Sequence, residues 1–573
     1  MQQAKIFWNE PEEAISFPAP GPGSWQRDPV HLPLPLTRYS DYIAVAFMRG
    51  LKDALAQYGL MLESIEPALV NGLGYIAVHP VGAPPGAKGP PPKWQFKLLL
   101  KLHPEIRRRI KTAANAMKKK IWRDDVREWQ QTLKPKSVEA HLRLQAIDPS
   151  VLDMQDLIAH LQICRAHCEA MAYQHFRLTV AAMLPVGDLL VHAKKWGGVE
   201  ASELLSLLRG SSAVSVGVAA DELRVLSDLI RKDAKLYGQL SAEKNWAAAY
   251  QILMQAPSPV RDAMHAYLNV VGFRMVDGYD ISGHYALEMP ELLVQTILHC
   301  VNDENALRHD QFEQHLQTDV MRRIPEKHRA EFRELLGEAR LVSCLRDERG
   351  VYSDAWAVGL ARRAILVAGA RLVEAGRLST AIELVDASHD EMLAMLRGES
   401  GPGSEELVRR ALFREKLRKL KAPSYLGLAP PTPPPADWLP EKAARVTRAF
   451  EVAFSFVQDG TDEKQGSDEI SGYSVYPGLS EGRARVVLGP QDFPRIEQGD
   501  ILVTQSTTPY FNVVLPLLKG IVTDRGGILS HAAIVAREYG IPGVVGTRNA
   551  TERIRDGVRV QVDGDMGIVR ILS

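Results

Sequence analysis

The sequence of 573 residues lacks any excess of charge and any long apolar run. Lysine and arginine together number 69, and aspartate and glutamate also number 69. A neutral chain has no overall field that attracts nucleic acid or an anionic membrane surface, so neither is expected as a partner. Aromatic residues make up only 7% of the chain. Because no run of 18 apolar residues occurs, no membrane-spanning helix is predicted.

Cysteine is scarce as well, with four residues in the whole chain. So few cysteines in so long a chain do not form a disulfide framework. Cys164 and Cys168 lie in a helical pattern with His167 between them, but a zinc site would need two further ligands, and none lie nearby in the sequence. Plain thiols and no metal site are therefore expected. The N-terminus also lacks the apolar core of a signal peptide, so a cytoplasmic protein is predicted.

Length and composition predict a multidomain protein with about two to four domains. Residues 1–40 are rich in proline and are expected to form an extended, non-helical arm. Residues 41–421 show mainly helical spacing of apolar positions. Residues 422–470 read as a linker, whose polar end at 458–469 is the best hinge candidate. Residues 471–573 alternate short strands with helices and predict a compact β/β/α domain.

A pair of glycines, Gly526 and Gly527, leads from an apolar run into a short helix of small residues. Ser530 is suited to cap the start of this helix, and Gly540 is suited to end it. His531 then lies in the first turn, where free backbone N–H groups and the positive end of the helix dipole favour an added anion. The glycines allow close approach of the backbone, as phosphate-binding loops require.

A phosphoryl group on the His531 imidazole is an anion of this kind. Neutral imidazole is a competent nucleophile near pH 7, and a histidine intermediate splits one transfer into two. Thr523 and Ser530 are expected to hydrogen-bond the phosphoryl oxygens. Arg537 either adds positive charge or only bridges to Glu538. Because one histidine cannot meet two partners in one place, the domain must move between them. The alternative is a structural histidine at a helix start.

The pattern Gly-Gly-x-x-Ser-His-Ala-Ala-x-x-Ala-Arg-Glu-x-Gly-x-Pro over residues 526–542 resembles the signature of the swivelling phosphohistidine domain of the PEP-utilising enzymes. This domain is shared by phosphoenolpyruvate synthases, pyruvate phosphate dikinases, rifampicin phosphotransferases and phenylphosphate synthases. Residues 477–484 extend the resemblance upstream. It implies that His531 is the phosphorylated residue and that residues 471–573 are the swivelling domain.

A weaker resemblance to the rifampicin phosphotransferases and phenylphosphate synthases extends through the helical region. It implies that residues 41–421 bind the phosphoryl acceptor. The residues that this resemblance places in the acceptor site are His31, Arg274, Asp280, His284 and Glu288. His31 or His284 would deprotonate the acceptor hydroxyl. The family usually has histidine before the arginine, where this chain has Phe273. Alternatively, Arg274 and Glu288 form a structural ion pair, and the N-terminal segment is a tail that packs through Trp25.

The sequence contains no Walker-type phosphate loop and nothing that resembles an ATP-grasp domain. The resemblance then implies a split enzyme, in which a partner ATP-grasp subunit holds ATP and Mg²⁺ and phosphorylates His531. The expected acceptor is a small hydroxylic compound, phenol or a related aromatic alcohol, which would become an aryl phosphate. The alternatives are a PEP-synthase-like phosphotransferase component with another acceptor, and a non-enzymatic phosphohistidine relay or scaffold protein.

Residues 93–130 are strongly basic, with tryptophan and phenylalanine interleaved. The neutral charge of the whole chain argues against nucleic-acid binding here. The segment is either a solvated helix face or a docking face for the partner protein or its nucleotide.

Overall fold

The structure is a computed structural model of the chain. It describes residues 5–9, 14–29, 32, 34–84, 89–208, 219–276, 278–302, 312–420, 422–455, 469–507, 511 and 514–572. The chain divides into two compact units. Unit 1 comprises Met1–Asp188, Asp280–Ser282 and Tyr352–Glu451. Unit 2 comprises Leu189–Tyr279, Gly283–Val351 and Val452–Ser573. The expected helical region, 41–421, is therefore shared between the two units.

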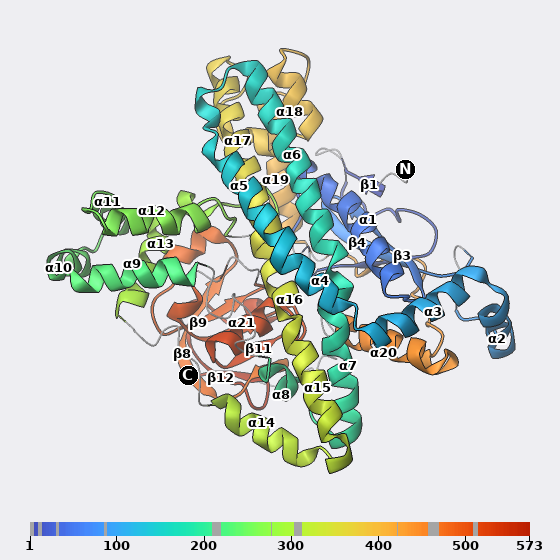
Figure 1. The fold of residues 1–573 in the computed structure, drawn as a ribbon. Coiled ribbons are helices and arrows are strands. Elements are labelled where there is room, and N and C mark those ends of the chain that lie inside the picture. The colour runs from blue at the N-terminus through green and yellow to red at the C-terminus, as the bar shows by residue number, and fades with distance from the viewer. Residues whose placement is uncertain are drawn as a thin grey trace. The chain divides into compact units, whose positions relative to one another are not determined.

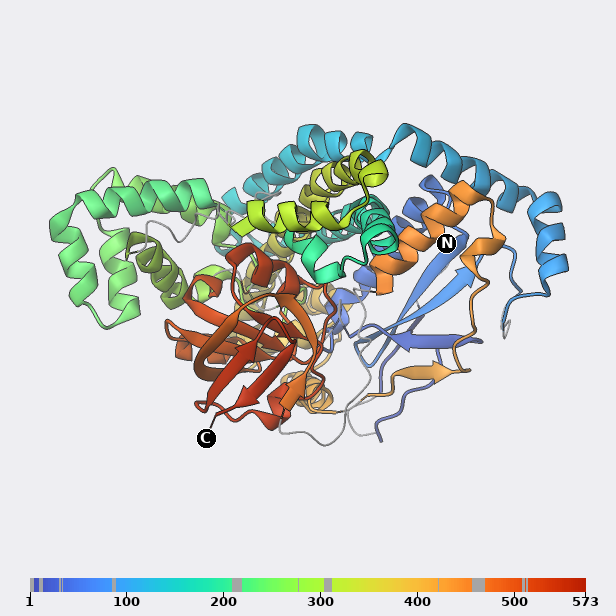
Figure 2. The same cartoon turned by 90° about the horizontal axis from the view of Figure 1, so that it is seen from below.

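Unit 1 contains a five-stranded sheet whose strands come from distant parts of the chain (Figure 2). The strand order is β1-β3-β4-β2-β5, and only the β1–β3 pair is parallel. The strands are β1 (Lys5–Phe7), β2 (Ser24–Arg27), β3 (Leu62–Val70), β4 (Leu73–Pro80) and β5 (Tyr425–Gly427). Two strands thus lie in the segment expected to be a separate arm, and β5 lies in the expected linker.

The β3–β4 hairpin is the local signal around which this sheet forms. Its two-residue turn is Asn71-Gly72, and both residues have positive φ, 54° and 77°, as a tight hairpin turn requires. The Asn71 side chain donates to Asn9 Oδ1 at 2.9 Å and so ties the N-terminal segment to the turn. Trp25 on β2 is fully buried against Tyr75 and its neighbours in the core of the sheet. The N-terminal segment therefore packs through Trp25.

The remainder of unit 1 is helical. Its main helices are α1 (Tyr42–Gln57), α2 (Lys93–Leu102), α3 (Pro104–Lys119), α4 (Trp122–Glu128), α5 (Lys134–Ala146), α6 (Met154–Arg177), α17 (Ala355–Glu374), α18 (His389–Leu396), α19 (Ser404–Arg418) and α20 (Glu441–Ser455). Helices α5, α6 and α17 run alongside one another (Figure 1). Helix α7 (Thr179–Gly197) continues from unit 1 into unit 2.

A hydrogen-bonded pair of histidines joins α5 to α6 and to the turn Gly350–Asp354 that precedes α17. The Nε2 atom of His141 on α5 lies 3.0 Å from the carbonyl oxygen of Tyr352, which can only accept a hydrogen bond. His141 therefore carries its proton on Nε2, and its Nδ1 accepts from Nε2 of His167 on α6 at 2.9 Å. Both rings are neutral in this arrangement. Burial, with a smaller effect of Arg143, lowers the pKa of His167 to about 4.

This histidine is expected to make the stability of unit 1 pH-dependent. Between its ordinary pKa of about 6.5 and the folded value, the unfolded chain binds a proton that the folded chain does not, so the free energy of unfolding falls as the pH falls. In His167→Gln, whose amide still donates to His141, the slope of unfolding free energy against pH in this window should fall by up to about 1.4 kcal/mol per pH unit. Urea titrations at several pH values, followed by tryptophan fluorescence, measure this slope. His265→Gln, at an exposed position on α12 (Val260–Val271), is the matched control. An unchanged slope in His167→Gln would refute the assignment.

Unit 2 combines a group of shorter helices with a C-terminal sheet domain. The helices are α8 (Ala201–Ser206), α9 (Ala220–Lys232), α10 (Ala234–Ala242), α11 (Trp246–Met254), α12, α13 (Pro290–Asn302), α14 (Phe312–Arg323), α15 (Arg329–Leu341) and α16 (Ser343–Arg349). Each unit thus contains helices and a sheet. The predicted fold class, a large mainly helical region with a C-terminal β/β/α domain, is confirmed.

The C-terminal sheet has eight strands in the order β6-β13-β12-β8-β9-β10-β11-β7. The strands are β6 (Glu469–Ser471), β7 (Tyr473–Tyr476), β8 (Leu479–Val487), β9 (Asp500–Thr504), β10 (Leu518–Thr523), β11 (Gly543–Val545), β12 (Arg559–Asp563) and β13 (Ile568–Ile571). Strands β8, β9, β10 and β11 are successive parallel neighbours. Helix α21 (His531–Tyr539) is the crossover between β10 and β11. Its position places the start of α21 at the carboxyl ends of parallel strands.

Within unit 2, the sheet domain packs against the helices at two places. Strand β7 contacts α8, and two short 3₁₀ turns, η9 (Pro490–Arg495) and η11 (Leu515–Leu517), contact α13. Most of the predicted hinge, 458–469, lies outside the described residues. These contacts hold the sheet domain against the helices of unit 2.

One helical stretch in the described part of the chain, Met154–Gly197, is long and apolar enough to cross a membrane, but 72% of its most apolar window is buried in the fold. This is the pattern of a core helix. The four cysteines are buried and free, and burial raises the pKa of Cys168 to about 12. Of the two expected alternatives for Cys164 and Cys168, core or surface thiols, the structure shows core thiols.

Candidate functional site

The connection from β10 to α21 forms the centre of the candidate site. The Ser530 backbone has extended dihedrals (φ −66°, ψ 162°), and its side chain accepts from the Ala533 N–H at 3.5 Å. The helix ends at Gly540, which is left-handed with φ 66°. Both predicted caps are therefore confirmed, and His531 is the first residue of the helix. Ligands of open α/β sheets bind at this edge, where helix N-termini face the carboxyl ends of the strands.

Gly526, in the connection before the helix, lies where a side chain would not fit. Gly526 has φ +105°, and a Cβ atom there would lie 2.8 Å from both Cβ and Oγ of Ser530. A Cβ on Gly546 would in turn lie 2.9 Å from the carbonyl oxygen of Gly526. The carbonyl of Gly527 accepts the Ser530 N–H at 2.9 Å. Gly526 is thus required for the connection to fold onto the cap of the histidine helix.

Thr523 and Asp524 hold the other end of this connection. Thr523 is fully buried, and its hydroxyl donates to the carbonyl oxygen of Arg525 at 2.8 Å. The Asp524 carboxylate accepts from the backbone N–H of Thr551 at 2.9 Å and from the Thr551 hydroxyl. Burial raises the pKa of Asp524, against the lowering effect of these bonds. Sequence reasoning did not single out Asp524. Its position between the end of a predicted strand and the glycine pair was the sequence feature that could have pointed to it.

Arg537 lies on the same helix but is not placed beside the histidine. It is 2% exposed, and it follows His531 by six residues, an offset that puts two side chains on different faces of a helix. The rise over six residues is about 9 Å. Whether Arg537 adds charge at the phosphoryl group or only bridges to Glu538 therefore stays a prediction.

The acceptor candidates Arg274 and His284 lie together in the loop between α12 and α13. The segments around Met275 and Tyr285 pair in antiparallel fashion. Within this pairing the Val276 N–H donates to His284 O at 2.7 Å, and the Ala286 N–H donates to Arg274 O at 3.0 Å. The structure thus brings two of the predicted residues onto adjacent backbone segments.

The other residues of this loop support its conformation. Glu288 Oε2 accepts the backbone N–H of Tyr285 at 3.0 Å, which holds the first turn of the short 3₁₀ helix Ala286–Glu288. The ring of Phe273 packs on Tyr285 with centroids 5.3 Å apart. Phe273, at the position where the resemblance leads one to expect histidine, is therefore a packing residue.

Tyr267 on α12 is a buried tyrosine whose ionisation is influenced by residues of both the acceptor loop and the histidine helix. The pKa of its phenol is raised, first by burial and then by Cys300 and Tyr539, while Arg274 lowers it. Tyr539 is the last residue of α21. Arg274, which is 6% exposed, and the C-terminal end of α21 therefore both lie within electrostatic range of the same buried tyrosine. Sequence reasoning did not single out Tyr267, because a buried tyrosine in a helical pattern carries no specific signal.

Two further acceptor candidates are not placed in a site. Asp280 belongs to unit 1, where its Oδ2 accepts from the Thr37 N–H and hydroxyl, both at 2.9 Å, and from the Ser40 hydroxyl at 2.6 Å. Its Oδ1 accepts the Ser282 N–H at 2.9 Å. These bonds give Asp280 a structural role, and its place in the acceptor site stays a prediction. His31 lies outside the described residues.

Among the described residues, no three histidine, cysteine, aspartate or glutamate side chains gather closely enough to hold a metal ion. What the site does offer is a helix N-terminus with one N–H already bonded to Ser530 and the remaining N–H groups of the first turn available to an anion. Its chemistry is therefore that of an anion held next to a histidine.

Two stretches of the chain match known protein families. Residues 496–567 match the mobile domain of the PEP-utilising enzymes. Residues 174–347 match the fourth domain of rifampicin phosphotransferase. The first stretch contains the whole β10–α21 connection, and the second contains the loop with Arg274 and His284.

Curated relatives match part of the chain. The chain is 31% identical over 316 residues to an uncharacterized phosphotransferase, YvkC, of Bacillus subtilis (54% of this chain, 36% of the relative). It is 30% identical over 326 residues to the rifampicin phosphotransferase of the same organism (55% and 35%). It is 42% identical over 112 residues to a probable phosphoenolpyruvate synthase of Archaeoglobus fulgidus (20% and 15%). The chain therefore spans about a third of the length of the first two relatives.

Proposed function

The chain belongs to the PEP-utilising enzymes through its mobile domain, and on this premise we propose that it is a phosphotransferase that carries a phosphoryl group on His531. The observation that carries the proposal is the position of His531 as the first residue of α21, behind a glycine connection at the carboxyl ends of parallel strands. An added phosphoryl group at this place meets free N–H groups and the positive end of the helix dipole. The site stabilises the charged intermediate more than the neutral histidine.

The reaction has two balanced steps. In the first, a nitrogen of neutral His531 attacks the phosphorus of the donor, an N–P bond forms, and the bond from phosphorus to the leaving oxygen breaks. In the second, the hydroxyl oxygen of the acceptor attacks the same phosphorus, the N–P bond breaks, and a base takes the hydroxyl proton. His284 is the described residue proposed for this base, and His31 is a second candidate.

The proposed donor is ATP, bound with Mg²⁺ on a partner ATP-grasp subunit. Attack of His531 on the β-phosphorus would release AMP and leave a pyrophosphoryl group on the histidine. Water would then cleave the bond to the γ-phosphorus and release phosphate, so that the β-phosphoryl group remains on His531. This route rests on the resemblance to split enzymes of the family. The matched region covers about a third of the rifampicin phosphotransferase of Bacillus subtilis, so about two thirds of that protein has no counterpart in the region shared with this chain. The partner subunit is thus proposed to supply the nucleotide site.

Helix α2 is the surface of unit 1 best suited to meet this partner. Trp94, Leu98 and Leu102 follow one another at helical spacing and are 67%, 49% and 67% exposed. A solvated face would carry polar side chains at such positions, whereas an exposed apolar stripe is typical of an interface. Lys97 and Lys101 accompany the stripe on the same helix. This pattern favours the docking interpretation of the basic segment over the solvated one.

The proposed acceptor is a small hydroxylic compound, phenol or a related aromatic alcohol, bound near Arg274, His284 and Glu288. Because donor and acceptor occupy different places, the sheet domain has to leave its contacts with α8 and α13 during the cycle. The polar stretch at 458–469 is the proposed hinge. The cytoplasm stays the predicted compartment.

One observation favours an alternative donor. The segment shared with the probable phosphoenolpyruvate synthase is 42% identical to this chain over 112 residues. A PEP-synthase-like component, with phosphoenolpyruvate as donor, is therefore kept as the second candidate. A non-enzymatic relay would share the phosphohistidine but release it to another protein.

Labelled donors distinguish these candidates. The full chain is incubated with Mg²⁺, ATP labelled at the β or the γ position, and host extract depleted of this protein. We expect acid-labile label on the chain from β-labelled ATP only, and its release as phenyl phosphate when phenol is added. Label from phosphoenolpyruvate but from neither ATP would overturn the ATP route in favour of the second candidate. If the label stays on the protein after phenol is added, the proposed acceptor is wrong.

A further inference from the structure

A second place in unit 2 has the features of a ligand site and lies outside the histidine connection. Helices α14 and α15 line a cavity of about 470 Å³ that is open to solvent. Its lining residues are Gln317, Thr318, Met321, Arg322, Arg329 and Arg333. A volume of this size falls within the range of small-molecule sites, about 300–1,000 Å³.

The described part of the cavity lining has charge of only one sign. Three of the six residues are arginines, and none is a carboxylate. Among the described residues, no ion pair joins Arg322, Arg329 or Arg333 to an acidic side chain, although neighbouring Arg323 pairs with Glu203 at 2.6 Å. The positive charge at the cavity is therefore not neutralised by any residue that the structure describes, and an anion would be attracted to it.

The polar groups of the cavity are also oriented. Nε of Arg329 donates to the carbonyl oxygen of Ile324 at 3.1 Å, which fixes the side chain and leaves its terminal NH₂ groups as donors. An NH₂ group of Arg340 donates to Oε1 of Gln317 at 3.4 Å, so the Gln317 amide is held through its oxygen and keeps its nitrogen as a donor. Planar guanidinium groups match the oxygens of a phosphate or carboxylate bidentately.

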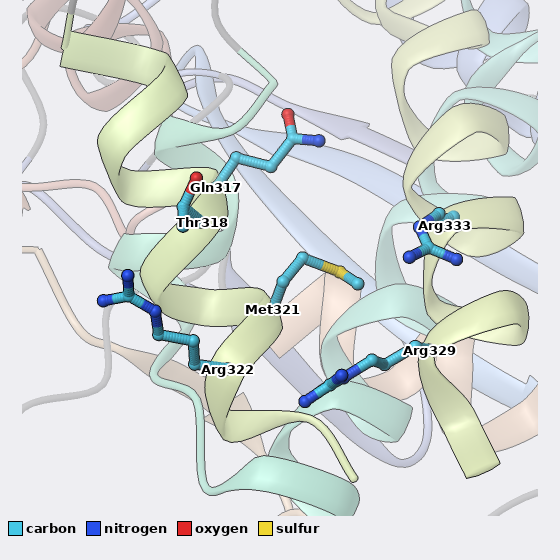
Figure 3. A pocket seen from close by; sticks show the side chains of 6 residues that line it. All are labelled: Gln317, Thr318, Met321, Arg322, Arg329 and Arg333. Atoms are coloured by element: carbon cyan, nitrogen blue, oxygen red, sulfur yellow. The ribbon is translucent and has the colours of Figure 1, made fainter. Parts of the chain in front are cut away.

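An apolar group completes the site. Met321 and Arg329 point toward one another across the space between the two helices, and Arg333 lies one turn further along α15 on the same face as Arg329 (Figure 3). The thioether of methionine packs well against aromatic rings. The cavity therefore presents cationic donors beside an apolar surface, the two parts that an anionic ring compound would meet.

The cavity is connected to the histidine site by packed elements of one unit. Helix α14 contacts α8, α8 contacts β7, and β7 contacts α21. All six lining residues also lie within the stretch 174–347 that matches the rifampicin phosphotransferase fourth domain. A ligand here would thus lie beside the helix on which the sheet domain rests.

We propose that the cavity between α14 and α15 binds a phosphate monoester whose phosphate is held by Arg329 and Arg333 and whose ring packs on Met321. An aryl phosphate released by the enzyme and a nucleoside monophosphate left by the donor share this chemistry. The proposal concerns binding, so its test does not require phosphoryl transfer to His531.

Calorimetric titration of the full chain tests the site. Phenyl phosphate, AMP, inorganic phosphate and phenol are titrated separately at low ionic strength. We expect at least one of the two esters to bind, inorganic phosphate to bind more weakly, and phenol not to bind. Added salt should weaken binding, because the cavity is open to solvent and its charges are screened. Binding of phenyl phosphate alone identifies the reaction product as the ligand, and binding of AMP alone identifies the nucleotide.

Variants of Arg333 locate the binding. Its side chain is exposed and makes no ion pair among the described residues, so Arg333→Gln should leave the fold intact. It should weaken ester binding on the order of tenfold, the effect of one charge-assisted contact, and Arg333→Glu should abolish binding. Arg555→Gln, an exposed arginine of the same unit away from the cavity, is the control and should bind as the wild type does. Undiminished binding in Arg333→Glu, equal affinity for inorganic phosphate and both esters, or no binding of either ester would overturn the assignment.

Discussion

Replacement of His531 by alanine is expected to abolish phosphoryl incorporation, with a fall of at least about 10³-fold, the scale seen when a covalent nucleophile is removed. The reason is that no other described side chain of the β10–α21 connection offers a neutral nitrogen at the helix start. Alanine is a good helix former, so the helix and its Ser530 cap should persist. The measurement is acid-labile label on the full chain from its donor, together with the thermal unfolding midpoint.

Two further variants make this result specific. His265→Ala removes an exposed histidine from α12 in the same unit and should label at the wild-type rate. Ser530→Ala removes the cap and costs about 1 kcal/mol of helix stability, so labelling should slow without disappearing. Full labelling of His531→Ala would refute the carrier role. Equal loss in His265→Ala would show that the assay reports something other than this site.

The second large effect is expected at Gly526. In Gly526→Ala the new Cβ lies 2.8 Å from Cβ and Oγ of Ser530, on a backbone with φ +105°. A non-glycine residue in such a conformation lowers the stability of the fold by about 1–3 kcal/mol. The collision with Ser530 can be relieved only if Ser530, the N-cap of α21, moves. Displacement of a catalytic group by about 1 Å can cost on the order of 10²-fold in rate. We therefore expect labelling of His531 to slow by about this factor.

The control for Gly526 is another glycine of the same domain. Gly557 also has positive φ, +84°, but a Cβ atom there meets nothing within 4 Å. Gly557→Ala thus introduces backbone strain without a collision and should lower the unfolding temperature while sparing the labelling rate. Equal labelling rates for the two variants would mean that the contact with Ser530 does not position the histidine helix.

The histidine helix is the part of the site that local sequence determined. Ser530, Gly540 and the glycine pair act on backbone groups within a few residues of themselves, so their effect does not depend on the rest of the fold. The structure accordingly confirms both ends of α21 and the place of His531 as its first residue. The alternation of short strands and helices beyond residue 471 is equally local, and it predicted the β/β/α domain.

Tertiary structure alone decided the sheet of unit 1. Strand β2 pairs with β4 on one side and with β5 on the other, and Tyr75 donates to the carbonyl oxygen of Pro423 across 348 positions in sequence. Proline-rich sequence specifies extended backbone but not the strand it will pair with. The same limit applies to Asp280. Its charge and loop position suited an acceptor site, but its partners, Thr37 and Ser40, lie about 240 residues away.

The surroundings of the acceptor loop and the arginine cavity were decided in the same way. Arg274, Tyr267 and Tyr539 come from three separate elements, and Arg322 and Arg333 become neighbours only because α14 and α15 pack together. Sequence by itself determined the chemistry of the histidine helix, since caps, glycines and helix dipole are short-range effects. Which side chains surround a substrate was determined by the tertiary structure, because burial and charge proximity arise only when distant segments meet.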